Sequence, residues 1–147
     1  MTHAITVAHT FETGHRLPHL TGKCENLHGH SWRAEVTVTS DELDQGTVVE
    51  FGAFKAALRE WIDVNLDHGL MLGIDDPLTD LLAPYGKVYR FVRTTGDWPT
   101  VENVAALIAA RATAILATIP HARGAYVSSV AVNETAVNTA TWNWSKP

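Results

Sequence analysis

The chain of 147 residues has a single cysteine, only 18% charged residues and no long run of apolar residues. One cysteine cannot form an internal disulfide bond, which is typical of a protein of the reducing cytoplasm or of a reactive thiol. Eleven Lys and Arg against sixteen Asp and Glu give a net charge of −5, the wrong sign for general binding to nucleic acids or anionic membranes. The most apolar stretch, residues 104–119, contains Arg111, so we expect no membrane-spanning helix. The N-terminus lacks a basic region followed by an apolar one, so we expect no secretory signal.

The composition is otherwise that of an average globular protein, with 46% hydrophobic residues, ten Gly and six Pro. The length suits one domain with a hydrophobic core, and the chain contains no repeat, low-complexity tract or linker. We therefore treat residues 1–147 as a single domain. The unusual feature is histidine, since the chain has eight and four of them fall between residues 15 and 30.

Two hydrophobic periods occur along the chain. Alternation of apolar and polar residues predicts strands at 4–12, 31–39, 125–134 and 139–144, with an extended piece at 47–51. Helical spacing predicts one helix from Ala53 to Leu66 and a second from Thr100, which can cap it, to Pro120. The expected inner faces are Phe54, Leu58, Trp61, Ile62 and Leu66 in the first helix and Val104, Leu107, Ile108, Ile115 and Ile119 in the second. Residues 69–98 are ambiguous, with a short helix at 77–83 and an extended piece at 87–93 as the best interpretation.

Because strands and helices are grouped rather than alternating, the sequence predicts an α+β fold rather than a parallel α/β one. Four strands backed on one side by two helices leave long sheet edges, which invite pairing with other chains. We therefore expect oligomerisation through the sheet edges.

Three histidines are spaced like the ligands of a metal ion. His28 and His30 stand at the start of the second predicted strand, where residues two apart point to the same face. His15 follows the first strand and can meet them across an antiparallel pair. Three neutral imidazoles and a water form the open tetrahedral geometry of catalytic zinc. Two other interpretations stay open: the histidines only form hydrogen bonds or face solvent, or Cys24 closes a structural zinc site as its fourth ligand.

Three further positions carry groups for acid–base chemistry or recognition. Cys24 near a zinc ion could act as a base or nucleophile, although it could also be a small buried hydrophobe. The pair Asp67 and His68 ends the first helix, where a carboxylate and the helix C-terminus tune an imidazole; such pairs are also common surface features. Glu134 ends a strand and is either solvated or placed for a ligand with two parallel N–H groups.

Taken together, the motifs resemble the 6-pyruvoyltetrahydropterin synthase / 6-carboxytetrahydropterin synthase family over nearly the whole chain. The matching motifs, in chain order, are FETGHRL at 11–17, CENLHGH at 24–30, VEF at 49–51, LDH at 66–68, PTVENVA at 99–105 and VNET at 132–135. The three residues between Cys24 and His28 are similar to the spacing of the carboxytetrahydropterin branch, because the pyruvoyl branch usually has two more.

The resemblance implies the tunnelling fold (T-fold): a four-stranded antiparallel sheet with two helices, three subunits closing a barrel and two trimers stacking into a hexamer. The site residues that it implies are the zinc ligands His15, His28 and His30, the proton acceptor Cys24, the relay pair Asp67 and His68, the pterin anchor Glu134, and further pterin contacts at Glu102 and Thr100.

The implied activity is that of a zinc-dependent lyase of the cytoplasm that converts 7,8-dihydroneopterin triphosphate to 6-carboxytetrahydropterin, on the route to deazapurines such as queuosine. The alternatives are pyruvoyltetrahydropterin formation, retro-aldol cleavage of dihydroneopterin, or a zinc-containing oligomer that binds a pterin or purine without turnover. Candidate ligands of the triphosphate are Arg16, Lys23, Arg90 and Arg93. Residues 69–98 are longer than in compact members of the family, so we expect this segment to reshape the mouth of the pocket.

Overall fold

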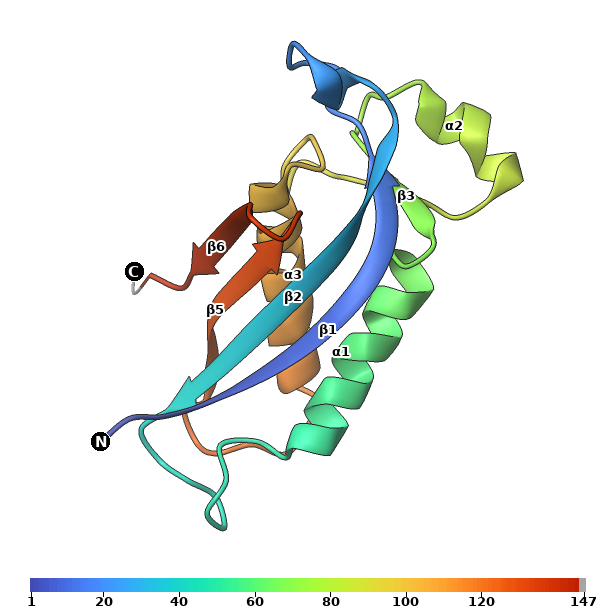
Figure 1. Ribbon diagram of the computed structural model, residues 1–147. Helices are drawn as coiled ribbons and strands as arrows, with labels where there is room; N and C mark the ends of the chain where they lie inside the picture. Colours follow the sequence, from blue (N-terminus) through green and yellow to red (C-terminus); the bar gives the residue numbers. More distant parts are fainter. Residues whose placement is uncertain (146–147) are drawn as a thin grey trace.

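The computed structural model describes residues 1–145, in which two helices pack on one face of a curved sheet (Figure 1). The strands are β1 (His3–His15), β2 (His28–Ser40), β3 (Gly69–Leu72), β4 (Val88–Arg90), β5 (Tyr126–Asn133) and β6 (Thr139–Asn143). The α-helices are α1 (Phe51–Asn65), α2 (Leu78–Leu82) and α3 (Val101–Leu116), and single 3-10 turns occur at Lys23–Glu25 and Ala83–Tyr85. The α+β class predicted from the sequence is confirmed.

The sheet has six strands in the order β4-β3-β1-β2-β5-β6, so the expectation of four strands was wrong. The predicted antiparallel core is present as β1–β2, β2–β5 and β5–β6. The two added strands come from the ambiguous segment 69–98, and they run parallel to the end of β1. The extended piece predicted at 87–93 contains β4, whereas β3 has only four residues, too few for an alternating pattern to identify it from the sequence.

The two longest strands, β1 and β2, form an antiparallel ladder with 13 residues on each side. Its register runs from His3 opposite Ser40 to His15 opposite His28. Side chains alternate between the helix-covered face and the exposed face, as the period of two requires. The ladder therefore brings the end of β1 and the start of β2, which carry three of the four clustered histidines, to the same place.

Both long helices start at side-chain caps. The carboxylate of Glu50 accepts the N–H groups of Gly52 and Ala53, so α1 begins at Phe51, two residues before the expected start. The extended piece expected at 47–51 is reduced to isolated bridges before this cap. The hydroxyl of Thr100 accepts from the N–H of Asn103, which confirms the predicted cap of α3.

The core lies between the sheet and the helices α1 and α3 (Figure 1). The predicted inner face of α1 is confirmed, with Trp61 at its partly buried margin. In α3 the prediction was partly wrong, because the helix ends at Leu116, four residues before Pro120. Ala112 and Leu116 are buried there, whereas Ile115 and Ile119 pack only at the edge. Small alanines let this helix approach the sheet closely, a role that an apolar count does not reveal.

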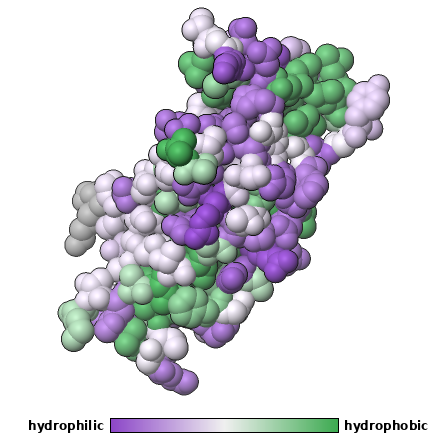
Figure 2. Space-filling view, viewed as in Figure 1, coloured by the Kyte–Doolittle hydropathy of each residue, from purple (hydrophilic) through white to green (hydrophobic). Residues whose placement is uncertain are grey.

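The surface is mixed in hydropathy, with a cluster of hydrophobic residues over α2 at the upper right of the view (Figure 2). Leu81 of α2 is 62% exposed in this region. In the described part of the chain, none of the helices has the length and apolar character needed to cross a membrane.

Candidate active site

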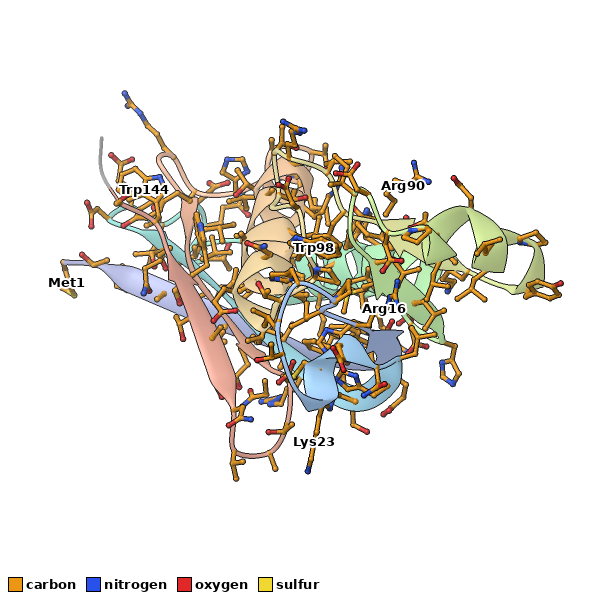
Figure 3. All side chains as sticks on the ribbon, turned by 90° about the horizontal axis from the view of Figure 1, so that it is seen from above. Met1, Arg16, Lys23, Arg90, Trp98 and Trp144 are labelled. Atoms are coloured by element: carbon orange, nitrogen blue, oxygen red, sulfur yellow. The ribbon has the colours of Figure 1, made fainter. Side chains whose placement is uncertain are left out.

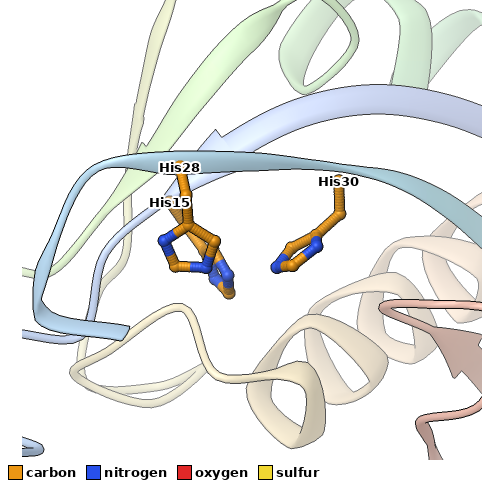
Figure 4. A group of neighbouring side chains, drawn as sticks. All are labelled: His15, His28 and His30. Atoms are coloured by element: carbon orange, nitrogen blue, oxygen red, sulfur yellow. The ribbon is translucent and has the colours of Figure 1, made fainter. Parts of the chain in front are cut away.

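Three imidazole rings meet at the end of the β1–β2 ladder and point to the same side of it (Figure 4). The register pairs His15 with His28, and His30 lies two residues further along β2 on the same face. One ligand nitrogen from each ring lies within 4.8 Å of those from the other two, close enough for the rings to share one ion. The predicted meeting of these histidines across an antiparallel pair is thus confirmed.

Backbone carbonyls orient two of the rings. The Nδ1 atom of His15 is 2.8 Å from the carbonyl oxygen of Pro99, and Nδ1 of His28 is 2.7 Å from that of Asn26. A carbonyl oxygen can only accept, so each Nδ1 carries the proton and each Nε2 keeps a free lone pair. This arrangement is typical of histidines that bind a metal through Nε2.

The buried nitrogens of the cluster lack protein partners. The Nε2 atoms of His15 and His30 are buried and form no hydrogen bond within the described chain. Unpaired buried polar atoms are rare and call for a ligand. Two such lone pairs in a group of three imidazoles fit a divalent cation that prefers nitrogen, such as zinc.

Burial favours the neutral form of His15 and His30. The side chain of His15 is completely buried, and this desolvation lowers its pKa to about 4, against the opposing effect of the Pro99 carbonyl. The pKa of His30 is also lowered by burial, which outweighs the opposing charge of Glu134. Neutral imidazoles are the form that binds a metal, so the lowered pKa values of His15 and His30 favour metal binding.

The indole ring of Trp32 packs against two rings of the histidine cluster. Its ring lies edge-on to His15 and His30, with centroids 5.1 and 5.6 Å away, and its indole N–H donates to the carbonyl of Thr13 over 3.0 Å. The side chain is 1% exposed and belongs to the core. A rigid aromatic base of this kind fixes the ring positions before any ligand binds.

The carboxylate of Glu134 lies beside the histidines, although the sequence placed it on a separate strand. It follows β5, and its Oε1 atom is 3.3 Å from Nε2 of His15 and 3.8 Å from Nε2 of His30. With His15 neutral and its Nδ1 proton donated to the Pro99 carbonyl, Nε2 of His15 and the Glu134 carboxylate face each other as two acceptors rather than as an ion pair. A cation or an N–H group between them would relieve the repulsion, so this position suits a ligand.

Cys24 lies in the loop that joins β1 and β2, on the 3-10 turn Lys23–Glu25, and is exposed. The interpretation of this residue as a buried hydrophobe was therefore wrong. Among the described residues, the group placed to hold a metal comprises the three histidines without this thiol. That finding argues against a closed site with Cys24 as fourth ligand, and the thiol is free for another role.

The pair Asp67 and His68 sits at the junction of α1 and β3. One carboxylate oxygen of Asp67 lies 2.8 Å from Nδ1 of His68, and the other accepts the backbone N–H of Glu12 over 2.7 Å. Burial raises the pKa of Asp67, but the Glu12 N–H, the His68 ring and the charge of Lys87 outweigh it and hold the pKa below its usual range. The His68 side chain is 79% exposed and has a left-handed backbone (φ 55°). We call Asp67 and His68 the dyad.

The remaining predicted substrate contacts differ in whether their polar groups are already bound to other parts of the chain. Thr100 uses its hydroxyl as the α3 cap, and Glu102 is exposed in the first turn of that helix. Arg16 is not free for an anion, because it forms two short hydrogen bonds with the buried carboxylate of Asp76. Arg90 pairs with Asp80 at the surface. Seen from above, the side chain of Lys23 projects outward at the lower edge of the view (Figure 3).

Sequence reasoning missed the groups that hold the site in place. The carbonyls of Pro99 and Asn26, the N–H of Glu12 and the indole of Trp32 each contact a site residue. Three of these four are backbone groups, which no residue type reveals. Only the motif position of Trp32, two residues after His30, offered a signal.

Known proteins that are similar in sequence to this chain are tetrahydropterin synthases. Residues 4–144 match the family described as 6-pyruvoyl tetrahydropterin synthase. A 6-carboxy-5,6,7,8-tetrahydropterin synthase of Rickettsia typhi is 37% identical over 98 residues, which cover 65% of this chain and 69% of that protein. The enzyme of the same name from Synechocystis is 39% identical over 84 residues, 52% of this chain and 65% of its own. These matches thus span about two thirds of each relative's length.

Solved structures share the fold across the whole chain. An uncharacterized protein from Wolinella succinogenes superposes with a TM-score of 0.81 at 22% identity, covering 97% of this chain and 98% of that one. The 6-pyruvoyl tetrahydropterin synthase of Caenorhabditis elegans gives a TM-score of 0.69 at 20% identity, with 99% and 97% covered. At these identities the likeness concerns the fold alone, and it confirms the predicted T-fold.

Proposed function

The chain belongs to the 6-pyruvoyl tetrahydropterin synthase family, and we propose that it is a zinc-dependent 6-carboxytetrahydropterin synthase. The proposed reaction converts 7,8-dihydroneopterin triphosphate and one water molecule to 6-carboxy-5,6,7,8-tetrahydropterin, with release of acetaldehyde and triphosphate, in a route to deazapurines such as queuosine. The observation that carries the proposal is the cluster of three histidines in which the Nε2 atoms of His15 and His30 are buried and unpaired. The names of the relatives support the carboxytetrahydropterin product.

In this proposal His15, His28 and His30 hold the zinc ion. When bound, zinc supplies a Lewis acid that polarises oxygen atoms of the substrate side chain. The carbonyls of Pro99 and Asn26 fix the tautomers of two ligands, so that the chain presents lone pairs rather than N–H groups.

The proton transfers fall to groups outside the histidine cluster. Cys24 removes a proton from the substrate side chain as a thiolate, and its exposed position gives a substrate access to the sulfur. His68 moves the second proton, with Asp67 holding the Nδ1–H of the ring so that Nε2 faces outward. The ordinary hydrogen-bond geometry of the dyad supports this relay role.

Recognition of the pterin is assigned to Glu134, with Glu102 and Thr100 as further contacts. An ionised carboxylate can accept the 2-amino group and the adjacent ring N–H of a pterin through two parallel bonds. The Glu134 side chain is 19% exposed, so such bonds would be partly shielded from water. Its position beside the histidines would place a bound pterin with its side chain over the metal centre.

We also propose that the protein works as an oligomer, built from trimers stacked into a hexamer, in the cytoplasm. No hydrogen bond or ion pair joins the dyad to the three histidines within residues 1–145, and we infer that a proton-transfer group that is 79% exposed is covered by another chain during the reaction. A neighbouring copy would supply that cover and would let the dyad act on a substrate bound next door. Mixing Cys24→Ala and His68→Ala proteins under reassembly conditions tests this: active mixed oligomers are expected, and inactive ones contradict it.

The decisive experiment is to incubate the zinc-loaded protein with 7,8-dihydroneopterin triphosphate and to identify the products by mass spectrometry. Formation of 6-carboxytetrahydropterin and acetaldehyde supports the proposal. A 6-pyruvoyl product, or cleavage of unphosphorylated dihydroneopterin, would identify another reaction of the family. Tight pterin binding with no product would identify a non-catalytic binding protein.

A further inference from the structure

Lys87 reaches back to the dyad from a distant part of the sequence. It directly precedes β4, and its ammonium group donates to the carbonyl oxygen of Asp67 over 2.6 Å and to that of Asp63 over 2.7 Å. The carbonyl of Asp63 lies in the last turn of α1, where the carbonyl groups of a helix lack partners in the helix, and Asp67 lies two residues beyond the end of α1. A cation at this end also favours the helix dipole. One side chain thus binds both ends of the turn that leads to His68.

The stem of Lys87 and its backbone reinforce the same turn. The carbonyl of Lys87 accepts the N–H of Leu70 over 3.0 Å. A Cβ atom at Gly69 would lie 3.0 Å from both the carbonyl oxygen and Cδ of Lys87 and 3.1 Å from its Cγ. Such distances are too short for a comfortable contact, so the residue after His68 must be small for the lysine to lie across it.

The conformation of the dyad requires this kind of support. His68 adopts a left-handed backbone, which is uncommon for a residue other than glycine and is retained only when neighbours hold it. Its N–H donates to the carbonyl of Glu12 over 2.6 Å, and the Glu12 N–H binds Asp67. The turn is therefore held by β1 on one side and by Lys87 on the other.

We propose that Lys87 is a positioning residue of the reaction, which clamps the end of α1 so that the carboxylate of Asp67 stays aligned with the ring of His68. This inference rests on the proposed function for the catalytic use of the dyad. It gives the segment 69–98 a role that differs from the expected reshaping of a pocket mouth. The pairing of its two short strands, β3 and β4, places the ammonium of Lys87 against the Asp67 carbonyl.

The charges around Asp67 agree with the clamp. On its own turn it faces His68, β1 contributes the N–H of Glu12, and the segment before β4 contributes the ammonium of Lys87. Asp63, on the last turn of α1, offers its carbonyl to Lys87, while its carboxylate is bound by His9 and Arg59. Removal of the ammonium would therefore take away a positive charge that helps keep the Asp67 carboxylate ionised.

The test compares Lys87→Met, which keeps the stem and removes the charge, with Lys87→Arg, which keeps the charge and donors. Lys55→Met, on the exposed part of α1, is the matched control. We expect Lys87→Met to lower kcat about tenfold, with KM and zinc content changed less than about twofold. Lys87→Arg is expected to recover most of kcat, and the control to match the wild type.

A second readout does not depend on activity. The pKa of the Asp67 carboxyl, followed by NMR, is expected to rise in Lys87→Met and to stay at the wild-type value in Lys87→Arg and in the control. An unchanged carboxyl pKa together with an unchanged kcat in Lys87→Met would overturn the inference. So would a loss of activity that Lys87→Arg does not restore, or one that follows the loss of folded, metal-loaded protein. If the wild type makes no product, the proposed function fails, and the NMR titration still tests the clamp.

Discussion

His15 of the histidine cluster and His68 of the dyad differ widely in exposure. His15 is completely buried, its ring is held by a carbonyl and an indole, and its pKa is lowered by burial. The His68 ring is 79% exposed and is held by a carboxylate on its own turn. Both rings are fixed through Nδ1, so both present Nε2, but one presents it to a buried centre and the other to solvent.

The difference separates two uses of histidine. A metal ligand must be neutral and preorganised, and burial in the end of a 13-residue ladder provides both. A proton shuttle must exchange its proton, so an exposed ring beside an ionised carboxylate is suitable. In the proposed function, all three metal ligands therefore come from one chain, whereas the group that moves protons depends on a tuned turn and on a neighbouring copy that covers it.

The largest expected effect comes from removing one histidine from each region. His28→Ala should lose most of the zinc and all measurable activity, because the ion would keep only two protein ligands. His68→Ala should retain about one zinc per chain while losing activity. Metal analysis of the purified variants distinguishes the two, with His19→Ala, outside the cluster, as the control. Full activity of the wild type after exhaustive chelation would contradict the role of the metal.

Cys24→Ala tests whether the exposed thiol belongs with the dyad or with the metal centre. We expect product formation to fall by at least about a hundredfold, the usual scale for a lost general base, while zinc content and fold are kept. Steady-state kinetics and metal analysis of the same sample check this. A parallel loss of zinc would mean that the thiol is a ligand after all.

The pH dependence of the unfolding free energy should differ between the contributions of His15 and of Asp67. The folded pKa of His15 is lowered to about 4, so the unfolded chain binds more protons than the metal-free folded chain between pH 4 and the usual value of 6.5. Stability from this residue is present above pH 6.5 and is lost as the pH falls toward 4. We expect the metal-free protein to lose about 2 kcal/mol of unfolding free energy between pH 7 and 5.

Denaturant titrations of the metal-free protein at the two pH values measure that loss. A His15→Asn variant lacks the titrating ring and should show a smaller difference. Asp67 does not enter this window, because its pKa lies below the usual range of a carboxyl and its contribution is lost only at lower pH. An equal pH dependence in wild type and variant would exclude His15 as the source.

The smallest expected effect concerns Glu134, which borders the metal centre without belonging to the ligand group. Glu134→Gln keeps the size but turns one acceptor into a donor, which would face an N–H of the pterin. A lost hydrogen bond to a charged group costs about 1.5–3 kcal/mol, so pterin affinity should fall at least about tenfold. Calorimetry with zinc-loaded protein measures it. Unchanged affinity would show that this carboxylate does not contact the pterin, and zinc loss would show that it binds the metal.

Much of the ligand group could be predicted from local sequence. The spacing of His28 and His30 is sufficient because a strand places residues two apart on one face, whatever the rest of the fold. The alternation of β1 and the helical period of α1 likewise depend on near neighbours, and both were confirmed. The Thr100 cap follows from a side chain that bonds three residues ahead.

The tertiary structure decided the features that depend on backbone groups or on pairing between distant segments. The β1–β2 register, which places His15 opposite His28, sums contributions from the whole ladder. The carbonyl of Pro99 is 84 residues from the ring that it orients, and the ammonium of Lys87 is 20 residues from the Asp67 carbonyl. The sequence by itself thus determined which side chains can bind a metal or move a proton. Only the folded chain decided which carbonyls hold them, because a peptide group is the same at every position until packing brings it next to a particular side chain.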